Sequence, residues 1–205
     1  MKRFRENHRE RYLSERELAR LGTAIRETED RAGAGVIAAI RLLILTGARK
    51  GEIRNLRWDE VDLEAAVLRL RDSKTGAKVI RLGAAAVEIL AGLERKHDLW
   101  VFPGASGTKP IVISSTWKQI RARAGLTDVR LHDLRHTYAS AGVSGGASLP
   151  VIGALLGHNR TETTRRYAHL SDDPIREASE RIDSKIAAAL DGKPPAEVVP
   201  IERSA

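Results

Sequence analysis

The sequence predicts a mainly α-helical α+β domain with one small antiparallel β-sheet. Through most of the chain, apolar residues recur at helical spacing and capping residues stand at the segment ends. Short β-type runs occur between residues 58 and 82, where a polar turn separates two of them. Strands and helices do not alternate along the chain, so a parallel sheet is not expected.

The N-terminal part is predicted to hold a basic arm and two helices. Residues 1–12 are polar and basic, as expected for a linker or arm. Ser14 and Glu17 form the S-x-x-E pattern of a capping box, which predicts that a helix begins here. The apolar segment Val36 to Leu45 predicts a mostly buried helix that ends at Gly47.

The predicted sheet follows a short helix or turn over Ala48 to Asn55. Its strands are expected at Trp58–Val61, Val67–Leu70 and Val79–Leu82. The polar run from Asp72 to Gly76 has the residues of a turn, so the last two strands should form a hairpin.

The rest of the chain is predicted to be helical, apart from a loop over Pro103 to Pro110. Helices are expected at Ala84–Arg95, Ser115–Ala124, His132–Ala141, Leu149–Leu156, Thr161–Leu170 and Pro174–Leu190. Ser148 and Thr161 are suited to cap two of them, and Gly157 follows the end of one. Residues 191–205 hold three of the seven prolines without an apolar period, which predicts a mobile tail.

The composition limits the functional classes. The formal net charge of +8 predicts a polyanionic partner, either nucleic acid or an anionic membrane surface. The absence of cysteine excludes disulfides, thiol nucleophiles and cysteine-based zinc sites, and it fits a reducing compartment. No signal peptide or membrane span is expected, because the start of the chain is charged and Arg41 interrupts the longest apolar stretch.

Several side chains are suited to phosphoryl transfer. They are Arg49, Lys74, His132, Arg135, His158 and Tyr167. His132 and Arg135 are three residues apart and therefore share a helix face. An arginine fork matches two phosphate oxygens and keeps its charge, and phosphoryl-transfer sites work mainly by positioning and charge stabilisation.

The segments that carry these residues resemble the motifs of tyrosine recombinases of the phage integrase family. The strings TGARKGEI, DSKTGAK, LHDLRHTYAS and LLGHNRTETTRRYAHL occur in the order of that family. The resemblance extends from about Tyr12 to about Leu190. It implies that residues 13–190 form the catalytic domain of a site-specific recombinase or integrase with the tyrosine recombinase fold.

The resemblance also implies a role for each matching residue. Arg49 and Arg135 would bind the non-bridging oxygens of the scissile phosphate. Tyr167 would attack the phosphorus and form a 3′-phosphotyrosine. Lys74 would protonate the leaving 5′ oxygen, and His132 would act as general base or proton relay.

Two further roles follow from the same resemblance. His158 would donate a hydrogen bond to the phosphate, and Glu52 would orient neighbouring side chains. Free tyrosine has a pKa of about 10, so a base or a cationic surrounding must favour the phenolate. The 5′ alkoxide of the DNA strand is a poorer leaving group than the phenolate of tyrosine, which explains why an acid is expected at Lys74. No metal, cofactor or ATP is expected, because arginines supply the charge and the covalent link stores the bond energy.

The implied partner is double-stranded DNA. In relatives, the segment that corresponds to Pro174–Leu190 docks onto a neighbouring protomer, so a tetramer on DNA and a monomer in free solution are expected. The expected location is the bacterial cytoplasm, on the nucleoid, for a bacterial or phage-encoded protein. Relatives carry a further DNA-binding domain before these motifs, so this chain is expected to be an excised domain or a short relative.

Two other functions fit part of the pattern. A type IB topoisomerase uses the same chemistry, although TGARKGEI and LLGH favour a recombinase. A catalytically idle DNA-binding or regulatory module is the alternative outside the enzymes, and the intact set of polar residues argues against it.

Some patterns are interpreted as structural. Gly142 to Gly146 matches the G-x-S-x-G elbow of hydrolases, but a helix rather than a strand is expected before it. His136 adjoins Arg135 and is interpreted as lying off the face that His132 and Arg135 share. His169 is given no role either. No pair among the six histidines has the H-E-x-x-H spacing, so no metal site is expected.

Overall fold

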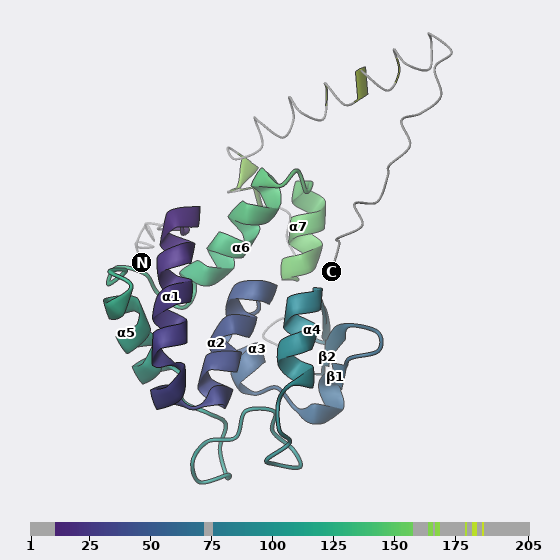
Figure 1. Ribbon diagram of the computed structural model, residues 1–205. Helices are drawn as coiled ribbons and strands as arrows, with labels where there is room; N and C mark the ends of the chain where they lie inside the picture. Colours follow the sequence, from purple (N-terminus) through teal and green to yellow (C-terminus); the bar gives the residue numbers. More distant parts are fainter. Residues whose placement is uncertain are drawn as a thin grey trace, which may run out of the picture.

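The computed structural model describes residues 11–71, 76–157, 164–165, 167–168, 179, 182–183 and 186. Helices make up most of this part of the chain, and a small sheet lies at its side (Figure 1). Most of the predicted arm and of the predicted helices after Gly157, and all of the predicted tail, lie outside the described residues. None of the described helices combines the length and the apolar character needed to cross a bilayer.

The first helix begins where the capping box predicts, and the second begins and ends within two residues of its predicted bounds. α1 spans Glu15–Ala32 and α2 spans Ala34–Thr46. The N–H of Glu17 donates to the Ser14 hydroxyl, and the Glu17 carboxylate accepts the N–H of Ser14 at 2.9 Å, which is the predicted capping box. α2 ends at Gly47, whose φ of 61° is left-handed and suits glycine. α2 lies between α1 and α4 in the middle of the molecule (Figure 1).

A short helix and a three-stranded sheet follow. The elements are α3 (Lys50–Arg54), the 3-10 helix η1 (Trp58–Glu60), β1 (Val61–Asp62), β2 (Val67–Leu70) and β3 (Lys78–Arg81). The strands are antiparallel in the order β1-β2-β3, and Leu68 pairs with both Val61 and Ile80. The hairpin of β2 and β3 is therefore confirmed, while its turn at residues 72–75 lies outside the described residues.

Two of the predicted strands have other bounds than expected. Trp58 to Glu60 form a 3-10 helix because the buried carboxylate of Glu60 accepts the N–H of Arg57 at 3.1 Å and that of Arg71 at 3.0 Å. These two bonds close a turn that an extended strand could not form. β3 begins at Lys78, one residue earlier than predicted, because the pairing with β2 extends to that residue.

The remaining helices are α4 (Ala84–Ala91), α5 (Ser114–Arg123), α6 (Asp133–Ser144) and α7 (Leu149–Leu156). α4 ends four residues before Arg95, the predicted end, because Gly92 follows it as the C-cap. α7 has the predicted bounds. α6 ends at Ser144, three residues beyond the predicted end at Ala141, so the first three residues of the G-x-S-x-G segment are helical and only Gly145 and Gly146 lie in the turn before α7. A helix precedes this turn, as expected from the sequence.

Apolar side chains form two clusters of unequal size. The main core joins α1, α2, α4, α5 and the sheet, and its fully buried members include Ile37, Ile40, Leu43, Leu68, Ile80 and Phe102. The α6–α7 cluster consists of Ala139, Val143, Ile152, Leu156 and Tyr167. α6 takes part in both, because Leu134 belongs to the main core.

Candidate active site

Polar side chains gather where the C-terminal ends of α2 and α7 meet the N-terminal part of α6. The guanidinium of Arg135 marks this point. Its Nη1 donates to the carbonyl oxygen of Gly47, after α2, and its Nη2 donates to that of Leu156, at the end of α7, both at 2.7 Å. Carbonyls at helix C-termini carry partial negative charge and attract a cation. Arg135 thus ties three helices together.

Arg135 can still bind an anion in this position. It is 4% exposed. A guanidinium has five N–H donors, so the bonds to two carbonyls leave donors for another group. Burial, and then the positive charge of Arg49, lower the pKa of Arg135 to about 10. The residue therefore stays charged at neutral pH.

Arg49, Glu52 and Lys78 form a linked set of charges beside Arg135. Arg49 precedes α3, and the carboxylate of Glu52 accepts its backbone N–H and its Nη1, each at 2.8 Å. The other partner of Glu52 is Lys78, whose Nζ lies 3.1 Å from Oε2. Burial acts to raise the pKa of Glu52, but the Arg49 N–H and the Lys78 charge outweigh it, so this pKa is lowered. Glu52 is thus a carboxylate that holds both cations, which fits its expected orienting role.

Sequence reasoning missed Lys78. Its side chain is only 6% exposed, and burial lowers its pKa in spite of the opposing charge of Glu52. The signal was the two-residue period of β3, which places Lys78 on the buried face with Ile80 while Val79 is exposed. With the turn predicted at Asp72 to Gly76 and the strand predicted to begin at Val79, Lys78 was assigned to neither.

Lys78 also explains the glycine that follows α7. Gly157 has a φ of 65°, and a Cβ at this position would lie 2.7 Å from Cε of Lys78. Only glycine allows the chain to turn here against the lysine stem. This approach brings the end of α7 next to the base of the β2–β3 hairpin.

The hydroxyl of Tyr167 lies beside His136 of α6. It is 2.6 Å from Nδ1 of His136, and both residues are buried, at 4% and 7% exposed. The ring of His136 meets that of His132 edge to face, with centroids 5.0 Å apart. The expectation that His136 lies off the functional face is wrong, because residues four apart in a helix are neighbours.

His132 differs from His136 in its exposure. It precedes α6 as the N-cap residue and is exposed to solvent. Burial of its ring and the positive charge of Arg135 lower the pKa of His132, although solvent screens this shift at an exposed residue. His132 is therefore mostly neutral at physiological pH and lies at the open side of the site.

The structure brings together most of the residues that the sequence singled out. Arg49, Glu52 and Tyr167 all influence the pKa of Arg135, and Arg135 influences that of His132. Lys74 and His158 lie outside the described residues. The two additions from the structure are Lys78 and His136.

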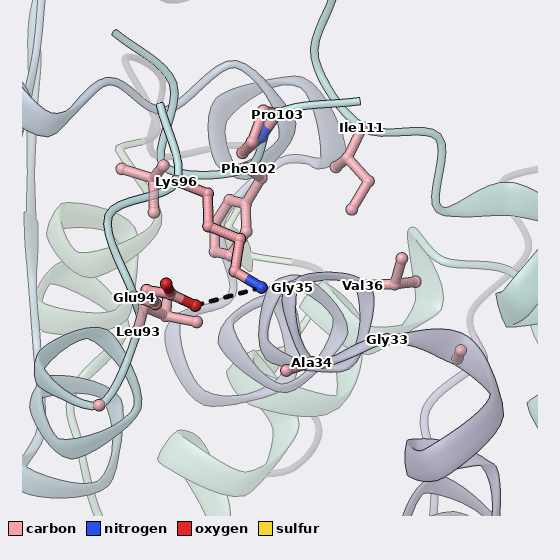
Figure 2. A pocket seen from close by; sticks show the side chains of 13 residues that line it. Gly33, Ala34, Gly35, Val36, Leu93, Glu94, Lys96, Phe102, Pro103 and Ile111 are labelled. Atoms are coloured by element: carbon pink, nitrogen blue, oxygen red, sulfur yellow. Dashed lines mark ion pairs between the residues drawn. The ribbon is translucent and has the colours of Figure 1, made fainter. Parts of the chain in front are cut away.

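A separate pocket of about 470 Å³ lies at the other end of α2 (Figure 2). Gly33, Gly35 and Phe102 help to line it, and an ion pair between Lys96 and Glu94 lies beside them. Apart from that pair, the described lining is apolar or backbone. This pocket offers little to a phosphate and is not part of the active site.

Comparison with known proteins gives a consistent result. The family model described as the phage integrase family matches residues 11–173. The integrase of Salmonella phage P22 is 31% identical over 163 residues, which cover 72% of this chain and 42% of that protein. This chain spans about half the length of the curated relatives that it matches.

Two solved structures support the same relationship. The crystal structure of XerA recombinase is 28% identical, with a TM-score of 0.66, over 88% of this chain and 66% of that one. The XerH site-specific recombinase bound to difH substrate, in a pre-cleavage complex, is 25% identical, also with a TM-score of 0.66, over 77% of this chain and 49% of that one. The fold expected from the sequence is therefore confirmed.

Proposed function

This chain belongs to the phage integrase family, and on that basis we propose that it is the catalytic part of a site-specific tyrosine recombinase. It cuts one DNA strand by forming a covalent bond to Tyr167 and rejoins strands by reversing that step. The observation that carries the proposal is that Arg49 and Tyr167 both lie close enough to Arg135 to shift its pKa, while the tyrosine hydroxyl is hydrogen-bonded to an imidazole.

The proposed reaction is a transesterification. The oxygen of Tyr167 attacks the scissile phosphorus, and the bond from phosphorus to the 5′ oxygen breaks. The products are a 3′-phosphotyrosine and a free 5′ hydroxyl. Arg49 and Arg135 bind the non-bridging oxygens, where negative charge grows in the transition state. Glu52 and the carbonyls of Gly47 and Leu156 hold the two guanidinium groups in place before DNA arrives.

Two roles in this mechanism rest on the family resemblance. Lys74 is proposed as the acid that protonates the 5′ oxygen, and His158 as a hydrogen-bond donor to the phosphate. The described neighbours of both residues lie near the site. Lys78 begins β3, the strand that follows the predicted turn with Lys74, and its Nζ pairs with Glu52. Gly157, which precedes His158, packs on Lys78.

The proposed partner is double-stranded DNA, as in the XerH complex with its difH substrate. The net charge of +8 favours such a polyanion. On DNA we propose a tetramer that forms through the segment Pro174–Leu190, with a monomer in free solution. The corresponding location is the nucleoid of a bacterial cell.

The direct test is trapping of the covalent intermediate. Purified protein is incubated with nicked duplexes of randomised sequence, from which the short 5′-hydroxyl fragment diffuses away after cleavage. An adduct that survives detergent is expected, with DNA linked to the peptide that contains Tyr167. The Tyr167→Phe variant should bind DNA as well as the parent and form no adduct.

The same assay separates the alternatives. A DNA-binding or regulatory module without activity gives binding and no adduct. A topoisomerase-like enzyme gives adducts on duplexes of every sequence and relaxes supercoiled DNA, whereas a site-specific recombinase enriches one sequence. An adduct that persists in Tyr167→Phe would show that another residue is the nucleophile.

A further inference from the structure

The short contact between Tyr167 and His136 suggests more than packing. A distance of 2.6 Å between a phenol oxygen and an imidazole nitrogen is short for a hydrogen bond. A nucleophile and a base within this reach, with the base oriented by a third group, form the usual arrangement of an activated nucleophile. Here the third group is His132, whose ring contacts that of His136.

We infer that His136 is the base that takes the proton of Tyr167 during strand cleavage. This inference rests on the proposed function. The hydroxyl proton of Tyr167 passes to Nδ1 of His136 as the tyrosine oxygen forms its bond to phosphorus. The bond from phosphorus to the 5′ oxygen breaks, and the electron pair leaves on that oxygen, which the acid of the site protonates. In rejoining, Nδ1–H of His136 returns the proton to the departing tyrosine oxygen.

The positions of the two histidines assign them different tasks. His136 is buried against the nucleophile, and the nitrogen that it presents to the hydroxyl is Nδ1. To accept the proton, the ring must carry its own hydrogen on Nε2. His132 is exposed and contacts His136 from the open side. His132 therefore packs against the ring of His136 and limits its orientation, while His136 is the residue that touches the reacting oxygen.

The surrounding charges fit this transfer. The negative charge of an ionised Tyr167 favours the charged form of Arg135 and acts to raise its pKa. The imidazolium that forms on His136 adds a positive charge beside a phosphate that is gaining negative charge. Burial of the pair keeps bulk water from competing for the proton.

The test compares two substitutions that both remove the base but differ in whether they can still hydrogen-bond the tyrosine hydroxyl. His136→Asn keeps an oxygen or nitrogen near the position of Nδ1, so it can hold the tyrosine hydroxyl but cannot take a proton. His136→Ala removes both functions. Ser140→Ala is the control, because Ser140 is buried on the same helix one turn later and is outside the proposed machinery. Folding of each variant is checked by circular dichroism and urea unfolding.

Single-turnover adduct formation is measured on a nicked duplex that the parent protein cleaves. Both His136 variants should be at least about 100-fold slower than the parent, and added imidazole should partly restore His136→Ala. Ser140→Ala should match the parent. A near-normal rate in His136→Asn would show that the histidine only positions the hydroxyl and would overturn the inference.

Other outcomes of the same assay also decide whether His136 is the base. Normal or faster cleavage by His136→Ala would mean that the contact is dispensable or restrains the tyrosine, and either result overturns the inference. If His136→Ala does not fold, the rate of His136→Asn relative to the parent is decisive. Failure of the parent to form any adduct would overturn the proposed function itself, and that result is distinct from a defect confined to the variants.

Discussion

Arg49 and Tyr167 belong to the same candidate active site, but different parts of the fold support them. Arg49 follows α2, which runs through the main core, and Glu52 holds its side chain against the buried Lys78 of β3. Tyr167 belongs to the much smaller α6–α7 cluster. The proposed phosphate-binding end of the site therefore rests on the larger of the two apolar clusters of the described residues, and the proposed nucleophile rests on the smaller one.

This difference separates two requirements of the chemistry. Stabilising a developing charge requires donors that do not move, because reorganising them during the reaction costs energy. A nucleophile that must form and later break a bond to DNA needs some freedom. Local stability generally follows the extent of buried apolar contact, so the α6–α7 cluster should open more easily than the main core. Arg135 joins the two parts through Gly47 and Leu156.

Replacing Arg135 with alanine should have the largest effect. Two buried carbonyls lose their donor, so the free energy of unfolding should fall by about 3 kcal/mol. Adduct formation should fall more than about 1,000-fold, because a phosphate clamp is also lost. Urea unfolding and the adduct assay measure the two losses.

Arg49→Ala is the matched variant for that experiment. The side chain of Arg49 is 24% exposed and Glu52 keeps Lys78, so its loss should cost less than about 1 kcal/mol of stability. Its effect on adduct formation should be as large as that of Arg135→Ala. Equal losses of stability in the two variants would mean that Arg135 does not join the helices as described.

The second prediction concerns the two apolar clusters directly. Ile152 of α7 and Ile40 of α2 are both fully buried, and Ile152 packs against Gly142 of α6. Ile152→Ala should lower the local stability by about 2 kcal/mol and speed hydrogen exchange of the α7 amides while those of α2 exchange as before. Ile40→Ala should speed exchange throughout both clusters. Equal acceleration in α2 and α7 by Ile152→Ala would show that the two clusters open as one unit.

The sequence predicted the elements that local patterns determine. β2 and α7 have the expected bounds, because alternation and flanking cap residues define them without reference to the rest of the chain. The error at Trp58 to Glu60 arose because the carboxylate that closes this turn also binds Arg71, eleven residues away. No local pattern contains that bond.

The sequence predicted which residue types form the candidate active site, but not which of their side chains contact one another. Motif resemblance identified Arg49, Arg135 and Tyr167, and the structure places them together. The partner of Tyr167 is His136, 31 residues away, and that pairing depends on how α7 packs on α6. Lys78 was missed for a similar reason, since only the register of β3 shows that it points inward.

The smallest predicted effect tests a tie between the main core and α6. Leu13 of the main core donates its N–H to the hydroxyl of Thr137 on α6 at 3.0 Å. Just before it, Arg11 pairs with Glu17 at 2.6 Å and with Asp128 at 2.9 Å. The hydrogen bond from Arg11 lowers the pKa of Glu17 to about 2. This ion pair holds the segment that carries Leu13.

Glu17→Gln should lower the free energy of unfolding by no more than about 1 kcal/mol at pH 7, because the pair is partly exposed. The pKa of Glu17 is lower in the folded state than in the unfolded chain, so its charge stabilises the fold above the ordinary value near 4.5. That contribution declines as the pH falls from about 4.5 toward 2. Urea unfolding of the parent and variant at pH 7 and pH 3 should therefore show a smaller difference in the free energy of unfolding at pH 3.

Asp128→Asn is the control and should change stability less, since Asp128 is more exposed than Glu17. A difference that is equal at both pH values would mean that Glu17 acts through its shape and capping bond, and that its charge does not support the tie to α6.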